Sequence, residues 1–193
     1  MLPAANEAGD GVGTVEPELL CLDDKVPSQH RALIIPMTPD QHITHLRAAN
    51  EVARKALARG KHPFGAVLVA PDGVTVLLEQ GNVDGVNHAE AVLARLAAHR
   101  FDAAMLWRCT LVTTVEPCAM CAGTQYWAHI GRLVYGVTES QLRALTGDHP
   151  ENPTLDLPSR TVFAAGSKAI EVVGPVAEVE DEILALHRGF WSR

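Results

Sequence analysis

Apolar residues recur every three or four positions after residue 38, which is the period of a helix that buries one face. The start of this helix is marked by the Thr38 hydroxyl at the N-cap, Pro39 at the first helical position and Gln41 at the position that completes a capping box. Gly60 supplies a stop, since glycine commonly follows the last helical turn. The pattern therefore predicts a helix between residues 38 and 60.

The rest of the chain alternates between short apolar runs and segments with helical spacing. Runs rich in β-branched residues and bounded by turn residues indicate strands. Strands are expected at residues 64–70, 74–78, 110–115, 132–137 and 169–173, with helices at about 88–99, 117–130 and 176–187. The polar, proline-containing stretch from 138 to 159 is expected to be irregular. This order of elements predicts an α/β fold, a three-layer α/β/α sandwich around a mixed sheet.

The length of 193 residues suffices for one domain with a well-buried core and leaves little for a second. Residues 1–37 lack periodicity, so we expect an irregular leader in which residues 32–35 can dock as a short strand, followed by the domain at 38–193. No apolar run reaches the roughly 20 residues that cross a bilayer, and the N-terminus lacks a basic segment followed by an apolar one. These features predict a cytoplasmic protein without a membrane partner.

The formal net charge of −7 bears on the choice of partner. Proteins that bind nucleic acids usually carry a basic face, because most of their affinity comes from neutralising phosphates. A local basic patch is compatible with an acidic chain. The balance nevertheless makes a nucleic-acid partner less expected than a small molecule.

Two short motifs carry the candidate chemistry: His88-Ala89-Glu90 and Pro117-Cys118-Ala119-Met120-Cys121. Cysteines three positions apart at the start of a helix lie on one side of its first turn, where the helix dipole favours thiolates. If the N-termini of the two predicted helices meet, His88, Cys118 and Cys121 supply three ligands to one Zn²⁺ ion. Three protein ligands leave a fourth position open, which is typical of catalytic rather than structural zinc.

Glu90 is predicted to be the carboxylate that transfers protons. It follows His88 by two residues, about 200° round a regular helix, so it faces a metal-bound water better than the metal. Zinc makes such a water acidic enough to attack a ring carbon, and Glu90 would pass its proton to the substrate and the leaving amine. The Cys pair alone also fits a redox pair or half of a structural zinc site. A structural site would need a fourth ligand, but Cys109 belongs to a predicted strand and His129 to the far end of a predicted helix. Cys21 and Cys109 are expected to behave as small apolar residues.

The chain resembles the cytidine deaminase-like superfamily of zinc deaminases over roughly residues 40–140. The matching motifs are Pro63-Phe64-Gly65-Ala66-Val67-Leu68-Val69, Gly81-Asn82, His88-Ala89-Glu90-Ala91 and Thr114-Val115-Glu116-Pro117-Cys118-Ala119-Met120-Cys121-Ala122-Gly123. The purine branch of that superfamily contains guanine deaminases and the tRNA adenosine deaminases that make inosine. Tyr126-Trp127-Ala128 is similar to the former, and Ala122-Gly123 with Ile130-Gly131-Arg132 is similar to the latter. The resemblance implies a five-stranded mixed sheet and a homodimer.

The resemblance also implies residues that contact the substrate. It assigns the nucleobase to Asn82, with Asn87 as an alternative because the loop before His88 is short. Guanine deaminases close the pocket of the same or the partner subunit with a C-terminal tail, and they use a second acid from a region that does not align here. Asp148, Glu151 and Asp156 are candidates for that acid by chemistry alone. The other residues expected to contact the substrate are Phe64, Ala89, Trp127 and Trp191. For Phe64 and Trp127, a place in the core is as compatible with the sequence as a place in the pocket wall.

Three functions are compatible with these motifs. The first is hydrolytic deamination of a free nucleobase or related amino-heterocycle, such as guanine, a pyrimidine base or an aminotriazine. The second is deamination of adenosine in tRNA, and the third is a non-catalytic zinc-stabilised interaction domain. Glu90 and the three-ligand site disfavour the third. The C-terminal helix begins with acidic residues where an RNA-binding version would carry Lys and Arg, so the first function is favoured; the acids are Glu178, Glu180, Asp181 and Glu182.

Overall fold

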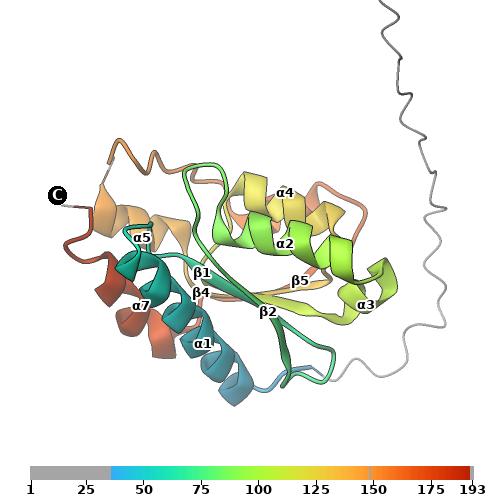
Figure 1. The fold of residues 1–193 in the computed structure, drawn as a ribbon. Coiled ribbons are helices and arrows are strands. Elements are labelled where there is room, and N and C mark those ends of the chain that lie inside the picture. Colours follow the sequence, from blue (N-terminus) through green and yellow to red (C-terminus); the bar gives the residue numbers. More distant parts are fainter. Residues whose placement is uncertain (1–35, 148, 192–193) are drawn as a thin grey trace, which may run out of the picture.

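The computed structural model describes residues 36–147 and 149–191 (Figure 1). Residues 1–35 of the expected leader, with its short strand and Cys21, and Asp148 lie outside the described residues, whereas Met37 packs into the core. Five strands form one sheet in the order β2-β1-β3-β4-β5. They are β1 (Gly65–Val69), β2 (Val76–Gly81), β3 (Thr110–Val115), β4 (Arg132–Val137) and β5 (Glu171–Val173). β1 is antiparallel to β2 and β3, whereas β3, β4 and β5 are parallel, which confirms the predicted five-stranded mixed sheet.

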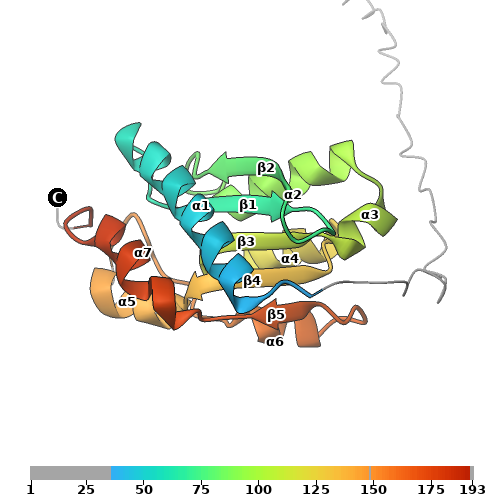
Figure 2. The same ribbon diagram turned by 90° about the horizontal axis from the view of Figure 1, so that it is seen from below.

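Helices cover both faces of this sheet (Figures 1 and 2). One face carries α1 (Pro39–Ala58) and α7 (Glu180–His187), and the other carries α2 (Ala89–Arg100) and α4 (Ala119–Trp127). The shorter helices are α3 (Ala103–Arg108), α5 (Glu139–Thr146), α6 (Ser159–Ala164) and the 3₁₀ turn Ala177–Val179. The three-layer α/β/α architecture is thus confirmed. Among the described residues, no helix is long and apolar enough to cross a membrane.

Alternating side chains of the central strands fill two separate cores. On β1, Ala66 and Leu68 pack with α2 and α4, whereas Val67 and Val69 face α1. This two-residue period is what a strand with helices on both faces requires. Gly65 permits the close approach of α1, because a Cβ atom there would lie 2.3 Å from the carbonyl oxygen of Ala49.

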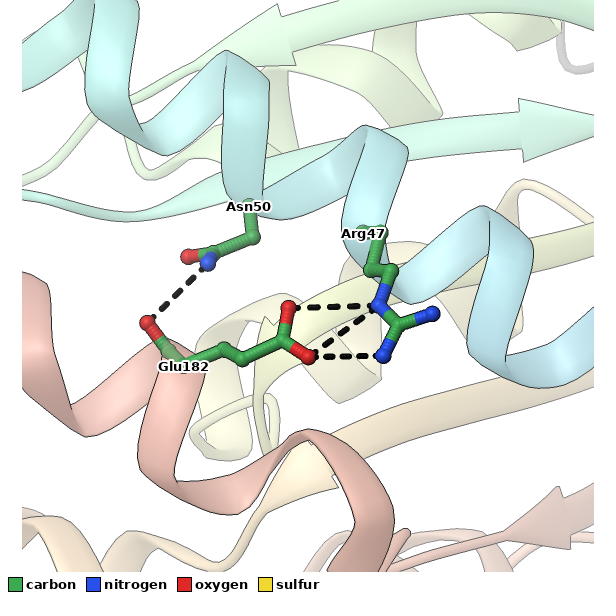
Figure 3. A network of polar contacts seen from close by, with 3 residues as sticks. All are labelled: Arg47, Asn50 and Glu182. Atoms are coloured by element: carbon green, nitrogen blue, oxygen red, sulfur yellow. Dashed lines mark hydrogen bonds and ion pairs between the residues drawn. The ribbon is translucent and has the colours of Figure 1, made fainter.

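Polar contacts join α1 to α7 across the outer surface (Figure 3). The Arg47 guanidinium donates to both carboxylate oxygens of Glu182 at 2.8–3.2 Å, and Asn50 Nδ2 donates to the Glu182 carbonyl oxygen at 3.1 Å. The Arg47 and Glu182 side chains are about half exposed, so water screens the ion pair and it adds little to the stability of the fold.

The structure corrects several predicted boundaries. α4 begins at Ala119 with Cys118 as its N-cap, so Pro117 precedes the helix rather than starting it. The second strand begins at Val76, not residue 74, because Asp72 accepts hydrogen bonds from the backbone of Val74 and Thr75 and holds them in the turn. The stretch expected to be irregular contains α5, which is capped by Thr138. α3 was also not foreseen, and the start of α6 falls at the end of the same stretch.

Candidate active site

The N-termini of α2 and α4 bring the predicted metal ligands together. His88 is the N-cap of α2 and Cys118 the N-cap of α4, and both have extended backbones. Cys121 follows in the first turn of α4 and is buried. His88 Nδ1 lies 3.7 Å from Cys118 Sγ and 3.6 Å from Cys121 Sγ, and the three ligand atoms all lie within 4.8 Å of one another.

These distances fit a tetrahedral zinc ion. Zn–N bonds of about 2.05 Å and Zn–S bonds of about 2.3 Å at tetrahedral angles place nitrogen and sulfur about 3.6 Å apart. His88 Nε2 lies 3.1 Å from the Gly85 carbonyl oxygen, and donating its proton there leaves Nδ1 for the metal. Neither Cys109 nor His129 belongs to this cluster. The residues present therefore fit a three-ligand site.

The three ligand side chains share protons that a metal would displace. The hydrogen bond to Cys118 raises the pKa of His88 to about 9. The hydrogen bond from the Cys121 thiol lowers the pKa of Cys118 to about 4, and donating that bond raises the pKa of Cys121. Metal binding releases these protons, since zinc takes thiolates and a neutral imidazole.

Glu90 lies on α2 beside the ligands and is almost fully buried. Thr113 of β3 donates a hydrogen bond of 2.6 Å to Glu90 Oε1, which fixes the direction of the carboxylate. Burial raises the pKa of Glu90 above its ordinary value, against the effect of the Thr113 hydrogen bond. A buried carboxyl that takes up a proton readily and is held in one orientation is suited to proton transfer.

A small cavity of about 30 Å³ adjoins these groups. That volume holds about one water, whereas pockets for small-molecule ligands measure roughly 300–1,000 Å³. The cavity is therefore closed to a heterocyclic ring in this conformation. Its lining consists of Phe64, His88, Glu90, Val115, Glu116, Cys118, Glu139 and Asn152.

Glu139 and Asn152 line the cavity but were not foreseen. Glu139 is the first residue of α5, directly after β4, and burial raises its pKa to about 7, with the negative charges of Cys118 and Glu90 adding to the effect. The pair Thr138 and Gln141 forms a capping box like that of α1, and this signal could have located Glu139 in a first helical turn. Asn152 belongs to a segment without regular structure and had no such signal.

Phe64 lines the cavity, whereas the two candidate asparagines do not. Asn82 is buried at the end of β2, where its Nδ2 donates to the Asp84 carbonyl oxygen at 3.1 Å and its Oδ1 has no partner among the described residues. Asn87 Nδ2 donates to the Asp84 carboxylate. Ala89 is fully buried beside His88 without lining the cavity. The assignment of the base to Asn82 thus stays a prediction.

The two tryptophans expected near the substrate occupy different environments. Trp127 is 76% exposed on α4 and lies in another groove with Trp107 and Lys168, so it forms neither a wall of this cavity nor part of the core. It falls more than two turns beyond Cys118, which turns it away from the site. Trp191 is buried against His62 and Phe64, behind the cavity wall rather than in it.

Of the candidates for a second acid, Glu151 and Asp156 are not among the residues that line the cavity. The Glu151 side chain is 71% exposed and lies 3.8 Å from His62 Nε2, and Asp156 is exposed. Asp148 lies outside the described residues. Glu116 is buried instead, and its Oε1 accepts hydrogen bonds from the Ser159 backbone and hydroxyl, which ties α6 to the rim of the site.

Comparison with known proteins identifies the family. Residues 39–137 match the family model described as "Cytidine and deoxycytidylate deaminase zinc-binding region". A protein of Schizosaccharomyces pombe named "Probable cytosine deaminase" is 38% identical over 158 residues, which are 79% of this chain and 94% of that protein. The chain belongs to this deaminase family. It is a zinc-dependent hydrolytic deaminase.

Other relatives span both branches of the resemblance. The guanine deaminase of Bacillus subtilis is 38% identical over 99 residues, or 49% of this chain and 63% of that protein. The tRNA-specific adenosine deaminase of Haemophilus influenzae is 36% identical over 125 residues, or 59% of this chain and 72% of that protein. The solved guanine deaminase of Nitrosomonas europaea, at 21% identity, superposes with a TM-score of 0.59 over 88% of this chain and 95% of its own, which supports the fold alone.

Proposed function

We propose that this deaminase removes the amino group of a free nucleobase or related amino-heterocycle and releases ammonia. The observation that carries the proposal is the extent of the match to the S. pombe protein, 94% of whose length is covered. The H. influenzae tRNA deaminase is covered over a smaller share, 72%.

In the proposed mechanism His88, Cys118 and Cys121 hold the zinc ion and Glu90 moves the protons. When bound, zinc supplies a nucleophile at neutral pH by lowering the pKa of a coordinated water. Glu90, held by Thr113, would accept one proton from the attacking water and deliver it to a ring nitrogen. It would then take the second proton, from the new hydroxyl group, and pass it to the amine, which leaves as ammonia when the C–N bond breaks. Phe64 and Val115 supply apolar walls that exclude bulk water.

The alternative is deamination of adenosine in tRNA, as the names of several relatives indicate for those proteins. The surface of α7 supports this alternative poorly. Asp181 contacts Arg188, and Glu182 contacts Arg47, so each of these acids has a basic partner. The helix Glu180–His187 itself contains no Lys or Arg to meet a phosphate.

Ammonia release from a substrate panel tests the proposal. The panel contains guanine, cytosine, isocytosine, aminotriazines, the corresponding nucleosides and tRNA. We expect turnover of at least one free base by the zinc-loaded protein and a loss of about 10²- to 10⁴-fold in the Glu90→Gln variant. Turnover of tRNA adenosine alone would overturn the proposal in favour of the alternative.

We further propose that the protein is a cytoplasmic homodimer, as the family resemblance implies. Trp127 supports the second copy, because it is 76% exposed and lines one groove with Trp107 and Tyr126, and grouped apolar side chains at the surface mark interaction sites. The free thiols of Cys118 and Cys121 suit a reducing compartment. Light scattering should give twice the chain mass, and Trp127→Ser should lower it, whereas Val74→Ser at another exposed apolar residue should not. A monomeric wild-type protein would contradict the dimer.

A further inference from the structure

Two side chains that line the cavity, those of Glu139 and Asn152, make no hydrogen bond that stabilises the fold among the described residues. Glu139 makes no hydrogen bond or ion pair among the described residues, and the N-terminus of its helix is already capped by Thr138 and Gln141. Asn152 Nδ2 is buried and likewise lacks a partner among the described residues. An unpaired buried amide is unfavourable, so a ligand that pairs with it binds more tightly.

The polar groups around the cavity are mostly acceptors. Glu90 and Glu116 contribute carboxylates, and each already receives a hydrogen bond from the protein, from Thr113 and Ser159 respectively. Glu139 is the third carboxyl group that lines the cavity, and no hydrogen bond from the described residues occupies it. Asn152, in contrast to the three carboxylates, supplies a hydrogen-bond donor, its Nδ2 amide group. A ligand that satisfies both must present an N–H group beside an acceptor oxygen.

We propose that Glu139 and Asn152 determine substrate specificity by binding the lactam edge of the ring, the –NH–C(=O)– unit, with Glu139 accepting from N–H and Asn152 donating to the carbonyl oxygen. This inference rests on the proposed function and narrows it. Free guanine, cytosine and isocytosine carry such an edge. Adenine, 2-aminopurine and melamine have no ring carbonyl, and cytidine has lost the N–H to its ribose.

The closed cavity assigns different roles to the two residues. Glu139 lies at the start of α5, where the capping box and the end of β4 fix it. Asn152 lies in the segment 149–157, which has no helix or strand of its own. Because a volume of about 30 Å³ cannot hold a ring, admitting one requires this segment to move outward. Asn152 then returns over the carbonyl oxygen, which makes closure dependent on the substrate having one.

Matched substrate pairs test the proposal with the zinc-loaded, full-length protein. Cytosine and 4-aminopyrimidine share the leaving amino group but differ in the lactam, as do guanine and 2-aminopurine. Asn152→Ala and Glu139→Gln should each lower kcat/KM for the lactam member by about 10- to 100-fold, mainly through KM, and change the other member by less than about threefold. The ratio of kcat/KM between the lactam member and the other member of each pair should therefore fall by about 10- to 100-fold.

Controls separate recognition from folding. Leu155→Ala changes an exposed residue of the same segment that does not line the cavity, and it should leave both members of each pair within about twofold of wild type. Zinc content and the melting temperature report on folding. Asn152→Asp keeps the size of the side chain but replaces the amide donor with an acceptor, so it should lower kcat/KM for the lactam member as Asn152→Ala does. An equal loss for both members in the Glu139 and Asn152 variants, or no change in either, would overturn the inference while leaving the proposed function intact. Absence of turnover of every free base would overturn both.

Discussion

Glu90 combines burial with a single strong hydrogen bond, and this combination makes its role testable. Replacing it with glutamine keeps the size and the Thr113 contact but removes the group that accepts a proton. We expect Glu90→Gln to retain about one zinc per chain and to lose activity by about 10²- to 10⁴-fold. Metal analysis and kcat/KM on the best free base measure the two effects. Loss of zinc in this variant would instead make Glu90 a ligand.

The two buried cysteines provide a matched pair for the ligand assignment. Cys121 faces His88 Nδ1 at 3.6 Å, whereas Cys109 donates to the Met105 carbonyl oxygen at 3.3 Å outside the cluster. We expect Cys121→Ala to lose most of its zinc, because three ligands fall to two, and Cys109→Ala to keep it. Elemental analysis of both purified variants decides the matter. Full occupancy in the Cys121 variant would refute the assignment.

Local spacing explains which site residues could be predicted. Cys118 and Cys121 are one helical turn apart, and His88 and Glu90 begin another helix, so their grouping needed only two helix ends to meet. Glu139 and Asn152 depend on how the chain folds back after β4, which is a long-range property. For Asn152 no local pattern exists, since it lies in an irregular segment between Pro150 and Pro153.

At the scale of elements, helix caps carried more information than apolar spacing. The capping box of Thr38 and Gln41 placed α1 correctly and is present in the structure. The same arrangement of Thr138 and Gln141 starts α5, although the polar composition of that stretch favoured a loop. Length is the physical reason: α5 has eight residues and buries only Leu142, so its apolar pattern is too sparse to detect.

The buried histidine of α7 makes stability depend on pH. Burial lowers the pKa of His187 to about 4, and the neutral ring accepts a hydrogen bond from Trp191 Nε1 at 3.2 Å. The unfolded chain, with a histidine pKa near 6.5, binds more protons between pH 4 and 6.5. Stability is therefore complete above about pH 6.5 and falls as the pH drops towards 4, by about 2 kcal/mol at pH 5.

Urea denaturation at pH 7 and pH 5 measures this effect. His187→Gln cannot be protonated, so its free energy of unfolding should decrease by about 2 kcal/mol less than that of wild type over the same interval. His62, whose pKa is also lowered by burial, remains in both proteins and cancels in the comparison. Identical pH dependence in the two proteins would contradict a buried neutral His187.

Trp191 joins the C-terminal end of α7 to the wall of the active site. Its ring lies 4.8 Å from His62 and 6.3 Å from Phe64, and Phe64 lines the cavity. We expect Trp191→Ala to lower the free energy of unfolding by about 3–5 kcal/mol and also to weaken turnover per folded molecule, because Phe64 loses its support. Thermal melts and kinetics corrected for the folded fraction separate the two effects. Reduced stability with unchanged kinetics would make Trp191 a core anchor alone.

At the scale of the whole molecule, the architecture followed from the order of elements, and the details of pairing did not. The predicted order of helices and strands, with one helix between the strands at 110–115 and 132–137, called for helical layers around a mixed sheet. The β1–β2 register shifts between Leu68 and Val69, and such irregularities are set by the turn geometry and by packing against α1. The predicted hairpin is therefore present, but its second strand runs from Val76 to Gly81 and not from residue 74 to 78.

The metal connects two helices that follow different strands, so its removal should affect the entire fold. Because zinc binds only the arrangement in which α2 and α4 meet, it stabilises the folded state by mass action. We expect a strong chelator to lower the melting temperature of wild type and of Glu90→Gln, and added zinc to restore both. The melting temperature of Cys121→Ala should not respond, and a response equal to that of wild type would contradict the linkage.

The order of these parts along the chain has a consequence for synthesis on the ribosome. Translation delivers His88, Glu90, Cys118 and Cys121 long before Asn152 and Trp191, and domains begin to fold while the rest is still being made. A nascent chain that has reached β4 already contains everything needed to capture zinc, yet it lacks the wall that closes over a substrate and the ring that supports Phe64. Metal loading is thus possible before release, and a chain that stalls at this stage carries reactive chemistry in an open, unselective site.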